Sequence, residues 1–308
     1  MPSLFVYGDA ALDIRLQTDD FPQLGGDVEV SSLDFLPGGS ASNCAVVAAR
    51  LGATVNLIGI TGTDARAQVL IDDLAQHGID LTYLRQVNGA PGVILAVIGA
   101  HGERTFFSYR GVNATCTYGE LPPTLFGHGD ILHISGYTFQ TAHSRATAYA
   151  LIERARAQSD CHISLDPSYL SARDWKDPDL FATLDFCFPN REEAYLMTGE
   201  RDPERAAEQL RAAGVKTVAI KLGDQGCYVT SAHGSAHLPA YTADQVVDTI
   251  GAGDAFCGGF LCAILAGEGE QDAARLGMAA AAYVIAVAGG HAGAPTREQA
   301  LRLMDAHS

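Results

Sequence analysis

The sequence has little positive charge and almost no lysine. Among its 308 residues, 20 are Lys or Arg and 36 are Asp or Glu, which gives a formal net charge of −16. The only lysines are Lys176, Lys216 and Lys221. A surface this negative repels the phosphates of nucleic acids and of anionic lipids, so we expect neither a nucleic acid nor a membrane as a partner. A lysine that lies beside a site is therefore a candidate functional residue.

Long apolar runs, paired cysteine motifs and a secretory leader are also missing. The longest apolar run, Met278–Ala288, falls short of the ~18 residues that a membrane span needs. The N-terminus has no basic region and already has the pattern of a strand. We expect a cytoplasmic protein with buried thiols, because no C-x-x-C pair occurs among its seven cysteines, which are Cys44, Cys116, Cys161, Cys187, Cys227, Cys257 and Cys262.

Several well-known motifs of nucleotide and metal sites are absent. No Gly-Lys dipeptide occurs, which excludes a Walker A loop, and neither H-R-D nor D-F-G of the protein kinases is present. Gly289–Gly293 is rich in glycine but follows a helical pattern, whereas a nicotinamide-dependent oxidoreductase needs a strand, then glycines, then a helix. The ten histidines show no H-E-x-x-H or comparable ligand spacing, so we expect them to be scattered.

The chain does contain alternating strand-like and helical segments. Short apolar runs predict buried strands at Leu4–Tyr7, Val55–Ile60, Ile131–Ile134, His162–Leu165, Phe186–Phe188, Thr217–Ile220 and Cys227–Thr230. Helical periodicity separates many of them, at Ala41–Leu51, Ser144–Ala157, Pro203–Ala213, Ala252–Ala266 and Gln271–Ala288. This order predicts an α/β fold, a doubly wound and mostly parallel sheet with helices on both faces.

Two regions interrupt this alternation, Asp13–Phe35 and Gly92–Tyr109, which have strand patterns and turn residues but no helix. Val93–Val97 and Thr105–Tyr109 flank Gly99–Glu103, which predicts a hairpin. We expect the two insertions, at about 13–36 and 92–110, to pair into a small lid over the sheet. Because there is no repeat or linker, we predict one domain over residues 1–308, with the lid as a candidate homodimer interface.

The strongest chemical signal is the string D-T-I-G-A-G-D-A-F, which begins at Asp248. It follows a strand-like segment, Gln245–Val247, and opens a long apolar helix. Its small residues allow backbone N–H groups to point into one concavity at the helix N-terminus, which suits the charge on a phosphoryl group in transfer. Asp254, in the first helical turn, is placed to accept a proton from an attacking hydroxyl. The alternative is a glycine turn in which Asp254 only caps the helix.

The full string resembles the C-terminal signature of the ribokinase-like family, also called the PfkB carbohydrate kinases. The resemblance implies that Asp254 is the catalytic base and that Gly251, Ala252 and Gly253 form the anion hole. It also implies transfer of a phosphoryl group from ATP, with Mg²⁺, to a hydroxymethyl group of a small sugar-like substrate.

The N-terminal third carries the residues that the resemblance assigns to the sugar. The string P-G-G-S-A-S-N is similar to the first family signature, and Asp13 matches the family aspartate that binds sugar hydroxyls. Two glycines allow a substrate to approach the backbone, and an asparagine offers a donor and an acceptor to a diol. The candidate substrate-binding residues are thus Asp13, Gly38, Gly39, Ser40 and Asn43. Taken without the family, Asp13 is more typical of a solvated turn.

Two further motifs point to the nucleotide. Asn190 and Glu193 match the family motif N-x-x-E, which implies a place near the phosphates and an outer-shell contact to Mg²⁺ for Glu193. The same pattern is typical of a helix N-cap followed by a first-turn acid, and both roles can hold together. Lys221, with Gly223 and Gly226, resembles the nucleotide-binding turn of the family, where the lysine would balance phosphate charge.

The resemblance also bears on a monovalent ion. In the family, the late loop that corresponds to Gly289–Gly293 borders the adenine pocket and often a monovalent-cation site. Asp248 and this loop are therefore the candidate K⁺ site.

One departure from the family informs the substrate class. Relatives specific for keto-sugar acids or fructose commonly carry D-x-N-x-R-x-x-L-W, but here Leu170 stands where that arginine would be. Arg110, at the end of a lid strand and expected to be exposed, is then the main candidate for a cation that binds substrate. A single arginine is expected to hold a substrate carboxylate only weakly. We therefore predict a neutral substrate, ribose-like first and a nucleoside second.

Two alternatives stay open. Within the family, the chain is a candidate kinase of 2-keto-3-deoxygluconate or fructose. Outside the class of enzymes, a ligand-binding homologue would keep the fold and lose the chemistry, although such a protein has no reason to retain Asp254 behind an intact anion nest.

Overall fold

The structure is a computed structural model. It describes residues 2–99, 104–115, 117, 121–122, 124–157, 160–174 and 178–307. Most of the predicted hairpin turn, together with Cys116 and Lys176, lies outside the described residues.

The body of the molecule is built on a nine-stranded sheet in the order β13-β12-β11-β10-β9-β8-β1-β4-β5. Neighbours from β11 to β5 are parallel, and β12 and β13 add antiparallel strands at one edge. This confirms the predicted fold class. The strands are β1 Leu4–Tyr7, β4 Val55–Thr61, β5 Leu84–Gln86, β8 Ile131–Ser135, β9 His162–Asp166, β10 Phe186–Cys187, β11 Thr217–Lys221, β12 Cys227–Ser231 and β13 Gly234–Leu238.

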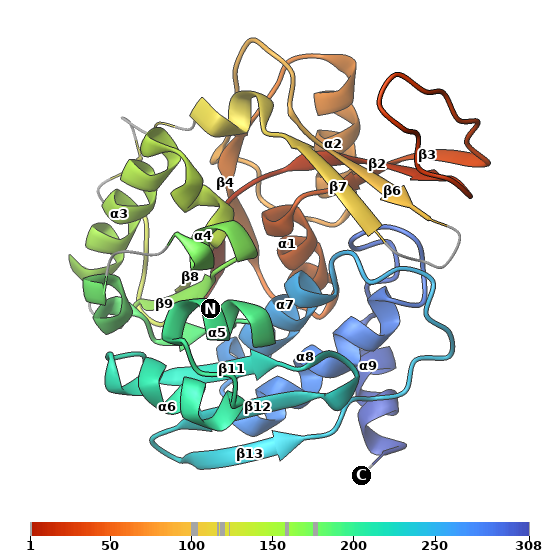
Figure 1. Ribbon diagram of the computed structural model, residues 1–308. Coiled ribbons are helices and arrows are strands. Elements are labelled where there is room, and N and C mark those ends of the chain that lie inside the picture. The colour runs from red at the N-terminus through yellow and green to blue at the C-terminus, as the bar shows by residue number, and fades with distance from the viewer. Residues whose placement is uncertain are drawn as a thin grey trace.

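Helices cover both faces of this sheet (Figure 1). They are α1 Ser40–Arg50, α2 Ala65–Gln76, α3 Ala142–Ala157, α4 Tyr169–Arg173, α5 Arg191–Thr198, α6 Pro203–Ala212, α7 Ala252–Leu265, α8 Glu270–Val284 and α9 Arg297–Asp305. No helix in the described ranges combines the length and the apolar character that a membrane span requires.

The core consists of two apolar clusters, one on each face of the sheet. Because side chains alternate along a strand, Leu4 and Val6 of β1 enter one cluster, and Phe5 and Tyr7 enter the other. The first cluster contains buried residues of α1, α7 and α8, and the second contains those of α3 and α6. Strands buried on both faces explain why their sequences read as continuous apolar runs.

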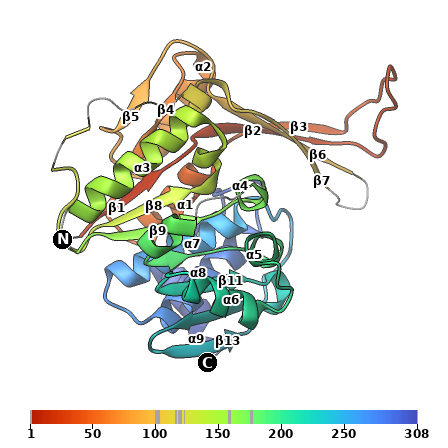
Figure 2. The same cartoon turned by 60° about the vertical axis from the view of Figure 1, so that its left-hand side comes forward.

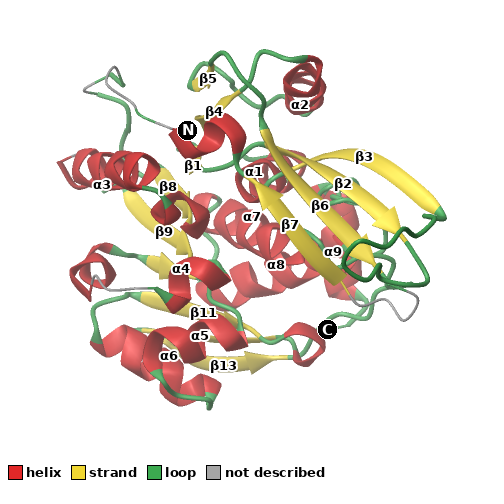
Figure 3. Ribbon diagram, turned by 45° about the horizontal axis from the view of Figure 1, so that its top comes forward, coloured by secondary structure: helices red, strands yellow, loops and turns green. Residues whose placement is uncertain are grey.

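A separate four-stranded sheet projects from the body as the lid (Figure 2). Its order is β3-β2-β6-β7, and it appears as its own sheet in Figure 3. The strands are β2 Ala11–Gln17, β3 Ser32–Gly38, β6 Gly92–Ile98 and β7 Arg104–Tyr109. Since β2 lies three residues after the end of β1, the lid grows directly from the edge of the body sheet where the parallel strands end.

The two faces of the lid differ. Cross-strand pairs Phe35–Ile14, Ile14–Leu95 and Leu95–Phe107 place these apolar side chains on one face. Leu33 and Tyr109 share that face and are 51% and 61% exposed. The opposite face carries polar residues, Asp13 and Arg15 of β2 and Asp34 of β3. Only the polar face is turned toward the body, because Leu36, the direct partner of Asp13, lies near Gly289.

The segment Gln245–Val247, predicted to be strand-like, is not part of either sheet. Val246 is 68% exposed, and the N–H of Val247 donates to the carbonyl of Ile285 at the end of α8. The β-branched residues suggested a strand, but here the backbone pairs with a helix end on its way to α7. The strand prediction for this segment was wrong.

Candidate active site

Polar side chains gather where the parallel strands of the body end. Ser135, Asp166 and Lys221 are the last residues of β8, β9 and β11, and Asp9 follows β1. The carboxyl ends of parallel strands meet at one edge of a sheet, which is where open α/β sheets bind ligands. The lid grows from the same edge, so the candidate site lies between the strand ends and the polar face of the lid.

The start of α7 has the backbone expected of an anion nest. Gly251 is the N-cap with a left-handed φ of +77°, and a Cβ atom there would lie 1.9 Å from the carbonyl oxygen of Gly290. Only glycine fits this position. Ala252 and Gly253 then open the helix, so their N–H groups are among those left without partners inside the helix.

Asp254 does not cap this helix. Its Oδ2 accepts a hydrogen bond of 2.8 Å from Nδ2 of Asn43, which lies on α1. Burial and then the nearby charge of Asp166 raise the pKa of Asp254 to about 7, although the Asn43 bond and Lys221 oppose the shift. A carboxyl group with a pKa near neutrality is well matched to accepting a proton.

Lys221 lies directly beside the nest. Its Nζ is 2.8 Å from Oδ1 of Asp166, and a Cβ atom on Gly253 would be 3.2 Å from that Nζ. Burial alone would lower the pKa of Lys221, but Asp166, with smaller contributions from Cys257 and Glu193, raises it. The ammonium therefore supplies a fixed positive charge at the nest.

Asp166 is a site residue that the sequence argument missed. Besides Lys221, it has Sγ of Cys257 at 3.6 Å from its second oxygen. The signal was available, because an acidic residue directly after an apolar strand stands at the ligand-binding edge of a parallel sheet. In the same stretch, Leu170 takes the place of the arginine that some relatives carry, and it lies on α4, 41% exposed.

Asn190 and Glu193 form a capping box at the start of α5. The N–H of Glu193 donates to Oδ1 of Asn190 at 2.9 Å, and the N–H of Asn190 donates to Oε2 of Glu193 at 2.8 Å. Burial raises the pKa of Glu193 to about 7, and Lys221 opposes this shift. The structure thus shows the helix-capping role, and the expected contact of Glu193 to Mg²⁺ stays a prediction.

The predicted nucleotide turn follows Lys221 directly. Asn190 pairs with Lys221 in an isolated parallel bridge, so the two predicted phosphate-side motifs lie next to each other. Gly223 and Gly226 are the first residue and the C-cap of a short 3₁₀ turn. A Cβ on Gly226 would lie 2.0 Å from the carbonyl oxygen of Leu238, so this glycine is required by the β12–β13 hairpin as well.

Asp13 lies at the lid side of the site with an unpaired oxygen. It is 4% exposed, and its Oδ1 has no hydrogen-bond partner within the described part of the chain. Burial, and then the charge of Asp248, raise the pKa of Asp13 to about 7. The carboxyl group packs against Gly38, where a Cβ would lie 2.1 Å from Oδ2. A buried, unsatisfied carboxyl oxygen is suited to a ligand hydroxyl.

The remaining residues of the first signature form the start of α1. Gly39 is its N-cap, and Oγ of Ser40 lies 2.5 Å from Oγ of Ser135 at the end of β8. Both amide atoms of Asn43, which the sequence predicts to serve a substrate diol, have partners in the protein. Asn43 donates to Asp254, and its Oδ1 lies 2.8 Å from Nδ1 of His291.

Arg110 is not the exposed cation that the sequence suggests. Its side chain is 15% exposed, and Nη2 lies 2.7 and 2.9 Å from the two oxygens of Asp9. Its Nη1 donates to the carbonyl of Tyr137 at 2.8 Å. The guanidinium is drawn inward because Asp9, at the end of β1, offers a carboxylate for a bidentate pair.

Tyr137 and Arg15 were also missed by the sequence argument. Tyr137 is 38% exposed as a whole residue, and desolvation of its hydroxyl, followed by the charges of Asp254 and Glu193, raises its pKa to about 12. Arg15 shares the polar lid face with Asp13, and its Nε has no partner among the described residues. Neither residue belongs to a recognisable motif.

Asp248 joins the nest to the late glycine loop. Its Oδ1 accepts from the N–H of Ile250 at 3.0 Å, and its Oδ2 accepts from the N–H of Gly289 at 3.4 Å. The contact fixes the Gly289–Gly293 loop against the start of α7. The expected K⁺ site at this place stays a prediction.

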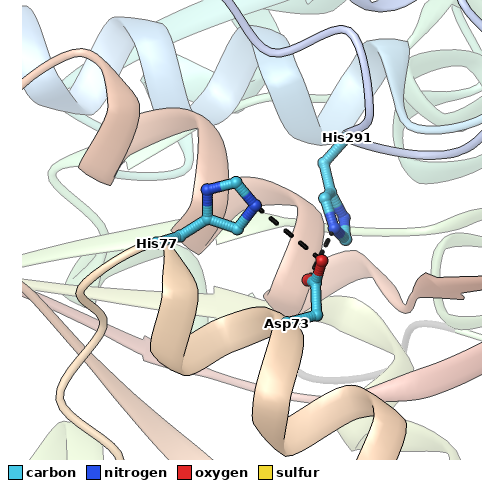
Figure 4. Close-up of side chains that lie close together, drawn as sticks. All are labelled: Asp73, His77 and His291. Atoms are coloured by element: carbon cyan, nitrogen blue, oxygen red, sulfur yellow. Dashed lines mark hydrogen bonds and ion pairs between the residues drawn. The ribbon is translucent and has the colours of Figure 1, made fainter.

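His291, on this loop, is the least expected member of the site. It is 4% exposed, and its Nε2 lies 3.0 Å from Oδ2 of Asp73 on α2. His77, at the end of α2, lies on the other side of the same carboxylate (Figure 4). The expectation that the histidines are scattered was wrong here, because the loop after α8 folds back onto α2.

Taken together, the site holds an anion nest, a lysine, a buried acid with a pKa near neutrality and an unpaired acid on the lid. The cluster of hard carboxylate oxygens on Asp166 and Glu193 beside Lys221 is the kind of donor set that suits a nucleotide with Mg²⁺. This arrangement is suited to moving a phosphoryl group from a nucleotide to a hydroxyl.

Comparisons with known proteins agree with that chemistry. Residues 1–297 match the profile of the pfkB family carbohydrate kinases. The 2-dehydro-3-deoxygluconokinase of Bacillus subtilis (strain 168) is 30% identical over 297 residues, which cover 92% of this chain and 91% of that protein.

Solved structures of similar proteins support the fold over the whole length. The ribokinase of Thermotoga maritima is 26% identical with a TM-score of 0.84, covering 99% of this chain and 100% of its own. The ribokinase of Arabidopsis thaliana, solved with ribose and ATP, is 25% identical with a TM-score of 0.81, covering 98% of each chain.

Proposed function

Since the chain belongs to the pfkB family of carbohydrate kinases and is an ATP-dependent carbohydrate kinase, we propose that it phosphorylates the hydroxymethyl group of a neutral, ribose-like sugar. The observation that carries this proposal is the pairing of charges at the site. Lys221 and Arg110 are each bound to a carboxylate of the protein, whereas Oδ1 of Asp13 has no partner among the described residues. The open position suits a hydroxyl group rather than an anion.

In the proposed reaction, Asp254 accepts the proton of the substrate hydroxymethyl group while that oxygen attacks the γ-phosphorus of ATP. The bond from the γ-phosphorus to the bridging oxygen of ADP breaks as the new P–O bond forms, which gives ADP and a phosphate monoester. The N–H groups of Gly251, Ala252 and Gly253 stabilise the charge on the transferring group, and Lys221 adds a fixed positive charge.

Mg²⁺ supplies further neutralisation of the phosphate charge when it is bound with the nucleotide. Asn190 and Glu193 are the residues that we assign to the metal-nucleotide, with Glu193 in the outer shell. Glu193 is buried near Lys221, whose charge lowers its pKa against the larger effect of burial, and a bound cation would favour its ionised form in the same way.

The electrostatics of the site favour a neutral acceptor. Burial raises the pKa of both Asp13 and Asp254, and the charge of Asp248 adds to the shift of Asp13, as the charges of Asp166 and Asp13 add to that of Asp254. A substrate carboxylate would add to this repulsion. A nucleoside is the next neutral candidate, because it presents the same ribose hydroxyls.

A second candidate substrate is a keto-sugar acid such as 2-keto-3-deoxygluconate. One observation favours it. Arg15 lies on the same face of β2 as Asp13, and its Nε is buried without a partner among the described residues. If Arg15 released Asp34, its acidic partner among the described residues, it would be the cation for a substrate carboxylate.

A coupled assay of ADP release over ribose, fructose, 2-keto-3-deoxygluconate and nucleosides tests the proposal. We expect the highest kcat/KM for ribose or a ribose-like sugar. If 2-keto-3-deoxygluconate is the best substrate, our interpretation of Leu170 and Arg110 is wrong, and Arg15→Ala and Arg110→Ala then identify the cation responsible. Sugar binding without ADP release from any member of the panel would indicate a non-catalytic homologue.

We also propose a K⁺ site at Asp248 and the Gly289–Gly293 loop. The support is that Asp248 ties this loop to the turn that forms the nest, so an ion there would stiffen the nest. Titration with KCl against Tris-chloride of equal ionic strength should raise both activity and Tm. No change in either quantity would contradict the site.

We further propose that the lid covers the candidate site, and that its outer face is the interface of a homodimer. Its outer face exposes Leu33, Phe35, Phe107 and Tyr109, each more than half exposed. Contiguous apolar surface of this kind is typical of an interface. A second copy of the chain is our proposed partner at this face.

A cytoplasmic location remains a separate prediction from the sequence.

A further inference from the structure

The cluster of Asp73, His77 and His291 takes no part in the phosphoryl transfer proposed above. Asp73 lies on α2, His77 directly follows that helix, and His291 comes from the loop after α8 (Figure 4). One ligand atom from each residue lies within 4.8 Å of the others, and among the described residues this is the only such group.

The hydrogen bonds around His291 fix which ring nitrogen carries a hydrogen. Asn43 donates through Nδ2 to the carboxylate of Asp254, so its Oδ1 faces Nδ1 of His291 at 2.8 Å. A carbonyl oxygen only accepts, and Nδ1 must therefore donate whenever Asp254 is ionised.

This assignment leaves an unsatisfied contact on the other side of the ring. In the neutral imidazole, Nε2 then carries a lone pair, and it points at Oδ2 of Asp73 from 3.0 Å. Two acceptors at this distance repel each other. Either a proton, carried by the ring or by the carboxyl group, or a metal ion has to lie between Nε2 of His291 and Asp73.

His77 favours the metal ion. Asp73 and His77 are four residues apart at the end of α2, so they share one side of the helix. Nε2 of His77 lies 3.8 Å from Oδ1 of Asp73, and its ring meets that of His291 edge to face at 6.0 Å between centroids. An imidazolium–aspartate ion pair is complete with two groups, whereas a metal ion needs a third ligand such as His77.

The donor set is typical of a zinc-class ion. Two imidazole nitrogens and one carboxylate oxygen, with a fourth position open to water, are common ligands of Zn²⁺. A ligating histidine usually donates its other ring N–H to an oxygen, as His291 does to Asn43. Asp73 and His77 are each 23% exposed, which leaves the site an entry path.

One neighbouring charge opposes a metal ion. Burial lowers the pKa of His77, Asp73 raises it, and His291 and then Arg50, the last residue of α1, lower it further, so Arg50 is near this ring. Its Nε is held by the carbonyl of Ala294 at 2.6 Å, so the guanidinium does not pair with Asp73 in the described structure. The charge of Arg50 should lower the affinity for a metal ion, but its guanidinium does not take the place of the ion beside Asp73.

We propose that Asp73, His77 and His291 bind a divalent transition-metal ion of the zinc class, separate from the Mg²⁺ of the nucleotide. The ion would hold His291 in the tautomer that donates to Asn43, and Asn43 in the orientation that donates to Asp254. Metal binding does not depend on the proposed function, whereas its link to catalysis rests on Asp254 being the base.

Titration of the EDTA-treated, full-length protein with Co²⁺ tests the site directly. We expect one Co²⁺ per chain with visible d–d absorption, without the strong near-ultraviolet bands of thiolate ligation, and displacement by Zn²⁺. His77→Ala leaves the bonds among Asn43, His291 and Asp73 in place and should weaken Co²⁺ binding by about 10-fold or more.

A matched control is His128→Ala. Nε2 of His128 also lies 3.0 Å from an aspartate, Asp160, but this pair is exposed and is not part of a three-ligand group. Its Co²⁺ titration should equal that of the wild type. Equal affinity in His77→Ala, or no binding to the wild type, would overturn the proposal and leave a proton as the cation beside His291.

A second measurement separates this proposal from the proposed function. Zn²⁺ adds positive charge behind Asn43, which favours ionised Asp254, so the acid limb of kcat/KM should move to lower pH in the wild type but not in His77→Ala. If Asp254 is not the base, the Co²⁺ result stands and this shift is absent. If the Co²⁺ result fails, the kinase proposal is untouched.

Discussion

The two acids proposed to face the sugar come from different sheets, and they are held in different ways. Asp254, in the body, accepts a hydrogen bond from Asn43, which is itself bonded to His291. Asp13, in the lid, keeps one oxygen without a partner in the described structure. Burial nevertheless raises the pKa of both to about 7. The body therefore fixes the orientation of its acid, which suits the proposed base, and the lid leaves an oxygen of its acid open, which suits the proposed binding role.

The two sheets also differ in how completely their faces are covered. Both faces of the body sheet are covered by helices, and the side chains of β1 and β4 are buried throughout. The lid has one face toward the site and one apolar face toward solvent, with Phe35 58% exposed. The lid therefore has one face available to a ligand and a second face open to solvent, whereas the body sheet has neither.

The largest expected effect is on the body acid. Asp254→Asn keeps the shape of the side chain and removes the base, so kcat should fall by about 10²–10⁴-fold while the KM for sugar changes little. Steady-state kinetics on the best substrate of the panel measure both constants. Near-normal turnover would remove Asp254 from its assigned role.

The pH dependence of activity should follow the same acid. Because the pKa of Asp254 is raised to about 7, kcat/KM of the free enzyme should fall about tenfold per pH unit below that value. Asp13 contributes to the raised pKa of Asp254, so Asp13→Ala should shift the acid limb to lower pH. An unshifted limb would mean that the two sheets do not communicate electrostatically.

Stability should respond to the same shift with a defined sign. The folded pKa of Asp254 lies above its ordinary value of 3.8, so its contribution to the free energy of unfolding is complete below about pH 4 and is lost as the pH rises through 7. Asp254→Asn should therefore raise the Tm at pH 8 and leave it nearly unchanged at pH 4. A lower Tm at pH 8 would contradict the buried, strained carboxylate.

The lid acid should affect binding instead of turnover. Asp13→Ala removes a buried partner for sugar hydroxyls, so KM for the sugar should rise by about 10–100-fold with a smaller change in kcat. Asp34→Ala is the control, because it removes an acid from the same face of the lid that is 46% exposed and pairs with Arg15. A loss of kcat without a change in KM would place Asp13 among the catalytic groups.

A smaller effect is expected at the phosphate side of the body. Glu193→Ala should raise the Mg²⁺ concentration for half-maximal activity by about 10-fold, and more than it raises the KM for sugar. It also breaks the capping box, so Glu193→Gln, which can keep both capping hydrogen bonds, separates charge from helix stability. An unchanged Mg²⁺ requirement in the glutamine variant would leave Glu193 a capping residue alone.

The smallest effect on activity is expected at the outer face of the lid. Phe107→Ser should shift the proposed dimer toward the monomer in sedimentation experiments. Activity should change little, because no residue of the candidate site is altered. Phe106 is 50% exposed, against 54% for Phe107, but it lies on the opposite face of β7. Phe106→Ser should thus leave the dimer intact. Equal behaviour of the two variants would exclude this face as the interface.

Much of the fold was readable from local patterns. The predicted strand Leu4–Tyr7 coincides with β1, and the predicted helix Pro203–Ala213 differs from α6 by one residue. Buried parallel strands are continuous apolar runs, so they stand out in any sequence. Gln245–Val247 also has a strand-like sequence, but no strand lies beside it to form a sheet. A local sequence pattern does not predict whether such a partner strand is present.

The candidate site was readable only in part. The string around Asp254 has a physical reason for its spacing, whereas Asp13, Lys221 and Glu193 were proposed from their resemblance to family motifs. Motifs did not locate Asp166 or His291, whose roles come from their partners. Arg110, expected to be exposed, is instead half of an ion pair, because Asp9, 101 positions earlier, follows the end of β1 beside it.

The sequence by itself determined the backbone of the candidate anion nest. Small residues ahead of an apolar helix give free N–H groups, a favourable dipole and an acid in the first turn wherever that helix lies, since all these interactions are local. Only the tertiary structure decided what surrounds the nest. Asn43 and Asp254 are 211 positions apart, and His291 and Asn43 are 248 apart. Such contacts exist because a parallel sheet gathers its strand ends at one edge, and a sequence does not state which distant segments will share it.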